Sequence, residues 1–182
     1  NTIMMDWSTD LEVAPLMLAM DSLQKSLVFT RLKGWDSKRD RIDVWWSGTY
    51  QNGDLMLLLA HLLSLSQHWR TAKIHLKTVV DEDALFEERE EALRQICQQT
   101  RIQAQCEVLI RQPSQSLNEV IVAHSRTADL VMLGMSLPEP DRADAFVEWY
   151  DTLAAGLDNV FFVRNSSPFK GQLIVDDGEE LD

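Results

Sequence analysis

Two strand ends carry residues that could bind a nucleotide. Asp6 ends the apolar run "TIMMD" and Gly134 ends the run "ADLVMLG". A carboxylate at a strand end could contact a ribose or adenine, and glycines after a strand could present backbone N–H groups to a phosphate. After Gly134 no glycine appears until Gly156, and Pro138 and Pro140 have no N–H. Asp6 and Gly134 therefore remain weak nucleotide candidates, and we expect no bound cofactor.

Histidines and cysteines do not fall in a metal-binding spacing. His61 and His68 are seven residues apart on an expected helix, whereas a helical zinc pair needs three or four and a carboxylate partner. Cys97 and Cys106 form no C-x-x-C motif; we interpret them as two reduced, partly buried thiols, with a disulfide as the alternative. No G-x-S-x-G motif occurs, and no histidine is an obvious partner for a serine. We predict no catalytic residue, no metal site and no enzymatic activity.

The charge of the chain argues against two classes of partner. Its 182 residues carry a net charge of −12, and the last seven, "DDGEELD", hold five acids and no base. Without them the balance is 24 acids against 17 bases, a net charge of −7. A nucleic-acid binder would need a basic stripe, and an acidic body disfavours docking on anionic lipid. No stretch approaches the ~18 apolar residues of a membrane span, so we expect no nucleic-acid partner and no direct membrane insertion.

Strand-like apolar runs alternate with longer amphipathic segments along the chain. Strands are expected at 2–7, 26–32, 42–46, 72–80, 102–111, 128–135 and 159–165, and helices at about 10–24, 54–68, 81–100, 114–125 and 143–157. This alternation predicts a doubly wound α/β domain with a mostly parallel sheet. We expect one domain over residues 1–165, with residues 166–182 as a loosely ordered acidic tail apart from a short strand "QLIV". A chain that begins without Met is expected to be part of a longer protein.

Adjacent tryptophans end the third strand, "IDVWW". Trp45 and Trp46 must face opposite sides of the sheet because side chains alternate along a strand. A central strand covered by helices on both faces could bury each indole, with ~150–250 Å² of surface apiece. The alternative places one indole at an interface or ligand crevice. Trp46 and Tyr50, in the turn that follows, are the interface candidates, and that turn is the expected partner of an indole N–H.

Two segments resemble the cytosolic C-terminal domain of the cation–chloride cotransporters. The first, 42–76, contains the "IDVWW" strand, a turn with Gly53, a leucine-rich helix, Trp69 and a basic "K-I" strand. The second, 117–165, ends on a pattern typical of that family, formed by Leu153, Gly156, Leu157, Val160, Val163 and Arg164, with Asn165 where glycine is common. The opening "NTIMMDW" is similar to a strand of the same family.

This resemblance implies a five-stranded parallel sheet like that of the universal stress proteins. It implies a non-catalytic domain on the cytoplasmic side of a membrane transporter, which forms a homodimer and regulates its own transmembrane transport domain. Compact loops such as 81–84 leave no room for the long phosphorylated inserts of eukaryotic members, which implies a prokaryotic homologue. The alternative function is a universal-stress-type sensor of a small ligand or nucleotide, with Asp6 and the loop after Gly134 as its site.

Overall fold

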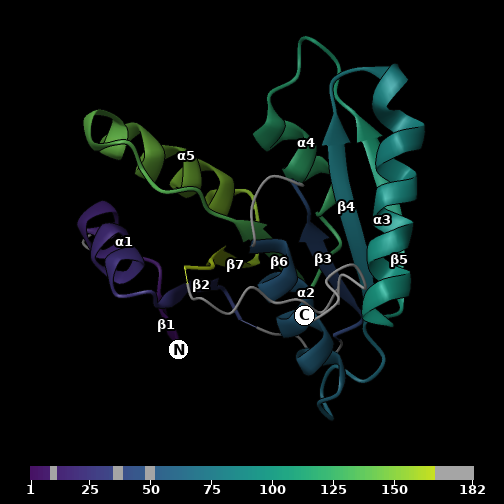
Figure 1. The fold of residues 1–182 in the computed structure, drawn as a ribbon, viewed down its shortest axis with the longest axis horizontal. Coiled ribbons are helices and arrows are strands. Elements are labelled where there is room, and N and C mark those ends of the chain that lie inside the picture. The colour runs from purple at the N-terminus through teal and green to yellow at the C-terminus, as the bar shows by residue number, and fades with distance from the viewer. Residues whose placement is uncertain (9–11, 35–38, 48–51, 167–182) are drawn as a thin grey trace, which may run out of the picture.

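Seven strands form one sheet in the computed structural model, which describes residues 1–8, 12–34, 39–47 and 52–166 (Figure 1). The strands are β1 (Thr2–Asp6), β2 (Ser26–Leu32), β3 (Arg41–Trp45), β4 (Lys73–Val80), β5 (Ala104–Ile110), β6 (Leu130–Gly134) and β7 (Asn159–Arg164). They lie in the order β1-β2-β7-β6-β3-β4-β5. All neighbours are parallel except β2 and β7, which confirms the mostly parallel sheet.

The five-stranded sheet implied by the family resemblance is wrong by two strands. Five adjacent strands, β7-β6-β3-β4-β5, are parallel throughout. β1 and β2 extend the sheet beyond β7, and β2 runs antiparallel to it, with Leu27 opposite Arg164. The smaller count therefore describes the parallel part alone. The apolar runs at 2–7 and 26–32 form the two additional strands.

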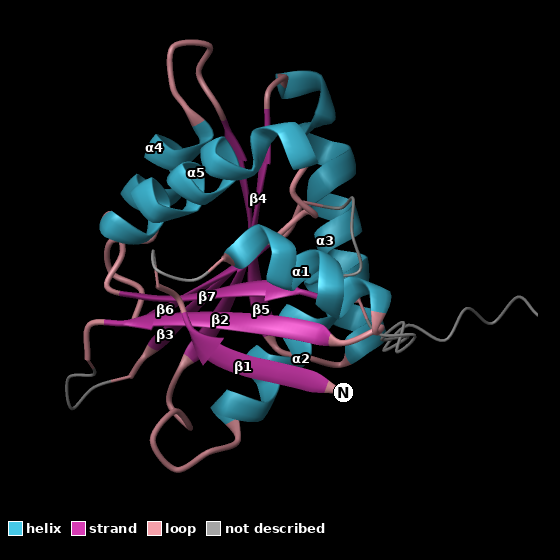
Figure 2. Cartoon of the chain, turned by 90° about the vertical axis from the view of Figure 1, so that its left-hand side faces the viewer, coloured by secondary structure: helices cyan, strands magenta, loops and turns pink. Residues whose placement is uncertain are grey.

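Five α-helices within the described residues cover the two faces of the sheet. They are α1 (Val13–Ser22), α2 (Asn52–Ser64), α3 (Phe86–Thr100), α4 (Leu117–His124) and α5 (Ala143–Ala155). Apolar residues of α2 and α3 pack on one face, and those of α1, α4 and α5 pack on the other. Figure 2 shows the strands between these helices, with α1, α4 and α5 above them and α2 below. The doubly wound arrangement predicted from the alternation is confirmed.

Helix starts depart from the predicted caps by a few residues. Ser116, not Ser114, caps α4: its hydroxyl accepts a hydrogen bond from the Glu119 backbone N–H, and the Glu119 carboxylate accepts one from the Ser116 backbone N–H. This capping box satisfies two backbone donors that the helix leaves free. α3 begins at Phe86 after a 3₁₀ turn over Asp83–Leu85. Asp10, the predicted start of α1, and the segment "QLIV" lie outside the described residues.

Trp45 and Trp46 lie on opposite faces of the sheet. Trp45 is 6% exposed and belongs to the core beneath α4 and α5. Trp46 is half-buried and packs against the core on the α2 side. Its ring lies so close to Gly53 that a Cβ atom there would overlap it. The first turn of α2 can therefore approach the end of β3 because residue 53 has no side chain.

Candidate functional site

The chain changes direction across the sheet between β3 and β6. From β3 the chain proceeds outward to β4 and β5, then returns to β6 and β7 on the other side of β3. Open α/β sheets bind ligands beyond the carboxyl ends of the two strands that flank such a switch point. In this protein those ends are Trp45 on β3 and Gly134 on β6.

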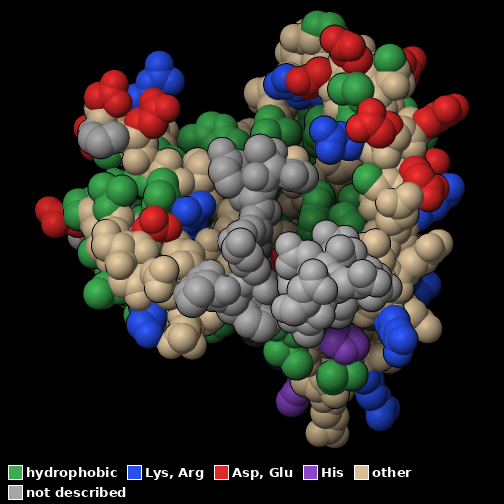
Figure 3. Space-filling model, viewed as in Figure 1, with side chains coloured by type: hydrophobic (Ala, Val, Ile, Leu, Met, Phe, Trp, Pro, Cys, Tyr) green, Lys and Arg blue, Asp and Glu red, His purple; other side chains and the backbone are tan. Residues whose placement is uncertain are grey.

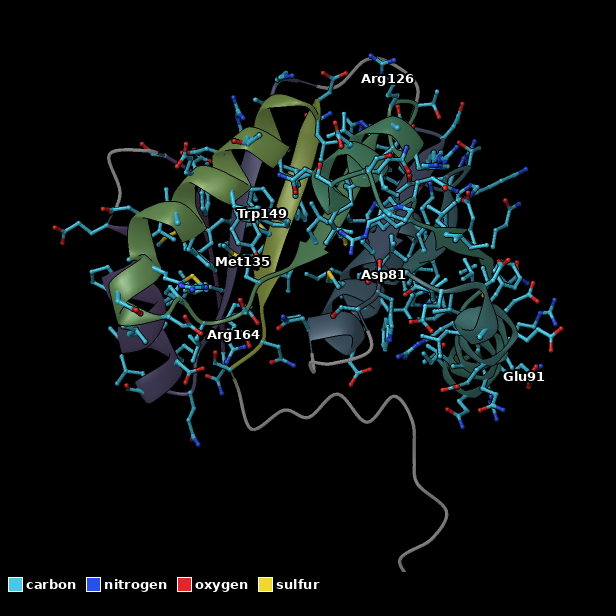
Figure 4. The ribbon with its side chains drawn as sticks, turned by 90° about the horizontal axis from the view of Figure 1, so that it is seen from above. Asp81, Glu91, Arg126, Met135, Trp149 and Arg164 are labelled. Carbon is cyan, nitrogen blue, oxygen red and sulfur yellow. The ribbon has the colours of Figure 1, made fainter. Side chains whose placement is uncertain are left out.

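A cleft of about 210 Å³ opens at the switch point. Three tryptophans, Trp45, Trp46 and Trp149, are among its lining residues. Its other lining residues are Ser47, Thr78, Val79, Leu117, Ile121, Leu133 and Gly134. Figure 4, which looks down on this end of the sheet, shows Trp149 on α5 toward the middle of the molecule. Because its walls are mostly apolar and aromatic, the cleft suits a flat or aliphatic group better than a triphosphate.

Backbone groups around the end of β6 already have partners. The Met135 N–H donates to the Val163 carbonyl (2.8 Å), and the Asn52 side-chain amide donates to the Met135 carbonyl (2.8 Å). The Tyr150 hydroxyl donates to the Gly134 carbonyl (3.2 Å). A Cβ on Gly134 would lie 3.1 Å from the Asn52 amide nitrogen. Glycine at this position therefore makes room for Asn52, which is a structural reason for its presence.

Asp6 and Gly134 are not brought together by the fold. Asp6 ends the edge strand β1, and β2 and β7 lie between β1 and β6. Its carboxylate accepts a hydrogen bond from the Thr30 hydroxyl (2.9 Å). The prediction for Asp6 assumed that the first strand of the chain is also the first strand of the parallel part of the sheet. In the structure that strand is β3. Of the two interface candidates, Trp46 lines the cleft and Tyr50 lies outside the described residues.

A buried ion pair lies beside the cleft, on the face that α4 covers. Asp43 on β3 and Lys77 on β4 are both 0% exposed, and the Lys77 Nζ lies 3.0 Å from the Asp43 Oδ2. Arg41 adds a second cation, with its Nε 2.7 Å from the Asp43 Oδ1. A buried carboxylate is tolerated only when it is paired and hydrogen-bonded. Both oxygens of Asp43 meet that condition.

The C-terminal end of α4 completes this ionic network. Lys77 donates to the His124 carbonyl (2.6 Å) and its Nζ lies 3.4 Å from a Glu107 carboxylate oxygen. The Ser125 hydroxyl donates to Asp43 (2.9 Å) and accepts from the Trp45 indole N–H (3.0 Å). A cation at a helix C-terminus is favoured by the helix dipole. The network therefore fixes α4 and Trp45, and with them one wall of the cleft.

This network was not predicted from the sequence, although the sequence contains a signal for it. Asp43 stands inside the apolar run "IDVWW", and Lys77 stands inside "KIHLKTVV". A charge in the interior of a buried strand requires an opposite charge nearby. Trp45 donates its indole N–H to Ser125 after α4. Residues 48–51 of the turn that was expected to accept from an indole N–H lie outside the described residues.

His75 lies on β4 near the ionic network. Burial lowers the pKa of His75, and the charge of Arg41 lowers it further, while Asp43 opposes this shift. The folded state therefore favours neutral imidazole. The unfolded chain binds a proton near pH 6.5, so on acidification the unfolded state gains that proton first.

His75→Gln is expected to flatten the loss of stability on acidification. Wild type should lose stability as the pH falls below about 6.5, because its unfolded state binds the extra proton. Urea unfolding at a series of pH values measures the slope. His68→Gln, at an exposed histidine, is the matched control and should keep the wild-type slope. Equal slopes for wild type and His75→Gln would contradict this assignment.

Lys77→Met should lower the free energy of unfolding by about 3–5 kcal/mol, because it leaves Asp43 buried without its ammonium partner. Urea denaturation followed by circular dichroism would measure the change. Lys73→Met, at an exposed position on the same strand, is the control and should stay within about 0.5 kcal/mol of wild type. A similar loss for both variants would contradict the importance of the ion pair.

Cysteine and acidic side chains offer no evident metal centre in the described ranges. No group of three or more His, Cys, Asp or Glu residues gathers there in a way that could hold a metal ion. Cys97 on α3 and Cys106 on β5 are free thiols with their sulfur atoms 3.4 Å apart. Burial raises the pKa of the Cys97 thiol to about 12, which keeps it protonated at neutral pH.

Among the solved structures that resemble this fold are two proteins of different kinds. The first is the cytoplasmic domain of a prokaryotic cation chloride cotransporter, at 16% identity and a TM-score of 0.67, covering 96% of this chain and 67% of that one. The second is a universal stress protein from Archaeoglobus fulgidus DSM 4304, at 13% identity and a TM-score of 0.54, covering 88% of this chain and 59% of that one. No curated protein sequence matches the chain.

The family model for solute carrier family 12 matches residues 16–115. The match extends from α1 through β5 and includes Asp43, Trp45, Trp46 and Lys77. It covers more than half of the chain and agrees with the resemblance seen in the sequence. The chain belongs to solute carrier family 12.

Proposed function

We propose that this chain is a non-catalytic cytosolic regulatory and dimerisation domain of a membrane cation–chloride cotransporter. The observation that carries the proposal is the family match over residues 16–115. In this role the domain lies on the cytoplasmic side of the membrane as part of an integral membrane protein. Its partners are its own transmembrane transport domain and a second copy of itself.

The geometry of the switch point supports a binding role without catalysis. The ammonium of Lys77 and the carboxylate of Asp43 are committed to each other and to neighbouring groups, so neither is free to act as a general acid or base. The cleft beside them has three indoles among its lining residues. Aromatic side chains with one exposed face are enriched in protein interfaces. No helix in the described ranges is long and apolar enough to cross a membrane.

Dimerisation can be tested with the two adjacent tryptophans. Size-exclusion chromatography with light scattering should give a mass that rises toward twice that of the chain as concentration increases. Trp46→Phe should weaken this association, because Trp46 is half-buried and lies at the carboxyl end of β3, where it is among the residues that line the cleft.

Trp45→Phe is the matched control for the dimer experiment. This change removes a buried hydrogen bond to Ser125, so it should cost about 1–3 kcal/mol of stability and leave the dimer in place. A monomer at every concentration would contradict the proposed dimer. Equal dimer formation by wild type and Trp46→Phe would show that Trp46 is not part of the dimer interface.

A small-ligand sensor is the second candidate function. The observation that favours it is the position of the cleft at the switch point, where α/β sheets bind ligands. The indole of Trp149, which lines the cleft on the side that α5 covers, could stack on a planar base. Asp6 has no part in this version of the site, because it lies on the far edge strand.

Thermal-shift measurements with ATP, AMP and cyclic nucleotides test the sensor function. A ligand at a hundred times its Kd adds about 2.7 kcal/mol of stability, which raises the Tm of a domain of this size by about 5–10 °C. Trp149→Ala should abolish the shift, since this indole lines the cleft. No shift with any of the nucleotides at millimolar concentration would rule this function out.

A further inference from the structure

The negative charge of the chain is concentrated away from one end of the molecule. Residues 81–91, which lead into α3 and form its first turns, contain seven acids and one base, whereas residues 55–80 and 92–106 contain no acid. Glu91, the last of these acids, precedes Arg101 by ten residues, or about 15 Å of helix. This separation is nearly two Debye lengths at physiological ionic strength. The acids at the start of α3 are therefore largely screened at its C-terminal end, and they have little effect on how that end interacts with a charged partner.

Basic side chains gather where α2 and α3 end. His61, Arg70 and Arg101 line one pocket of about 330 Å³, together with Ser64 and Gln103. Two exposed basic residues, His68 and Lys73, lie close by in the sequence. We call these five residues the basic corner: His61, His68, Arg70, Lys73 and Arg101. In Figure 3 blue and purple side chains lie at the lower end of the molecule and no red is visible there, while red side chains crowd the upper right.

Three cations of the basic corner have no salt-bridge partner among residues 1–8, 12–34, 39–47 and 52–166. No carboxylate in those ranges comes within salt-bridge distance of Arg70, Lys73 or Arg101. Asp40 lies beside the corner, where its carboxylate accepts a hydrogen bond from Thr71. Several basic side chains elsewhere are paired with acids, as Arg111 is with Asp81, Arg94 with Glu90 and Arg164 with Asp21. The basic corner is thus a local excess of positive charge that suits an anionic partner.

Two exposed leucines lie next to these cations. Leu62, which is 53% exposed, directly follows His61 in the last turn of α2, and Leu65, which is 68% exposed, comes directly after the end of that helix. Both leucines are therefore exposed at the end of the molecule that carries these cations. Apolar side chains flanked by basic ones are typical of surfaces that enter the headgroup region of a bilayer. A free phosphate would explain the arginines and leave the leucines without a role.

We propose that the basic corner, with Leu62 and Leu65, docks on an anionic lipid surface. Arg70 and Arg101 contact lipid phosphates, and the two leucines enter the headgroup layer. The inference rests on the proposed function in one respect, because a cytosolic domain of a membrane transporter has a bilayer within reach. The net charge of the whole chain argued against such docking. That number is a sum over an acidic end and a basic end of the molecule, so it does not describe the basic corner.

Flotation of the full 182-residue chain with lipid vesicles tests this docking. The chain should float with vesicles of phosphatidylcholine and phosphatidylglycerol, should not float with phosphatidylcholine alone, and should be released by salt. Arg70→Glu with Arg101→Glu should lower binding at least tenfold, since each basic residue near an anionic surface contributes about fivefold. Arg89→Glu with Arg142→Glu makes the same change in charge elsewhere on the surface and should bind as wild type does.

A second pair of variants separates lipid docking from simple anion binding. Leu62→Gln with Leu65→Gln should weaken flotation severalfold, whereas Leu23→Gln, at a leucine 61% exposed on another part of the surface, should not. Unchanged binding by the Leu62/Leu65 variant, or release by inorganic phosphate beyond that caused by other salts of equal ionic strength, would overturn the proposal. So would an absence of flotation with anionic vesicles at low salt. Light scattering of the Arg70/Arg101 variant reports dimerisation separately, so failure of either proposal can be recognised.

Discussion

The buried pair of Asp43 and Lys77 is the interaction on which the centre of the structure depends. It joins the neighbouring strands β3 and β4 on one face of the sheet. Through Lys77 and Ser125 it also holds the end of α4 against them. Two charges without access to water tolerate few alternative arrangements, since either one left alone would be strongly destabilising. The pair therefore restricts which helix can cover this part of the sheet and how closely it can approach.

Most strands and helices could be predicted from the alternation of apolar runs, because each run has one periodicity and a polar boundary. The strand at Ser26–Leu32 was placed to the residue. The position of the candidate site could not be predicted in the same way. Asp6 was expected near Gly134 because both end strands, yet strand order is a property of the whole sheet and placed β2 and β7 between them. Pairing of Asp43 with Lys77 likewise depends on register between strands that are distant in sequence.

The switch point of this domain lies where open α/β sheets bind ligands, but its residues are not those of a phosphate site. Asn52 occupies the space beside Gly134 and satisfies the Met135 carbonyl, while Tyr150 uses the Gly134 carbonyl. Indoles from β3 and α5 then line the opening. Polar groups that would otherwise face a ligand are used to join strands and helices, so the same topology supports a scaffold with an aromatic cleft.

The antiparallel contact of β2 with β7 has a mechanical consequence. Ser26, which begins β2, donates through its hydroxyl to Asn165 beyond the end of β7, and its backbone N–H donates to the Asn1 carbonyl. Entry and exit of the folded unit thus lie side by side at one end of the sheet. Tension applied through both would act across the strands β1, β2 and β7 and not along them, so their hydrogen bonds would be loaded one after another and not all together.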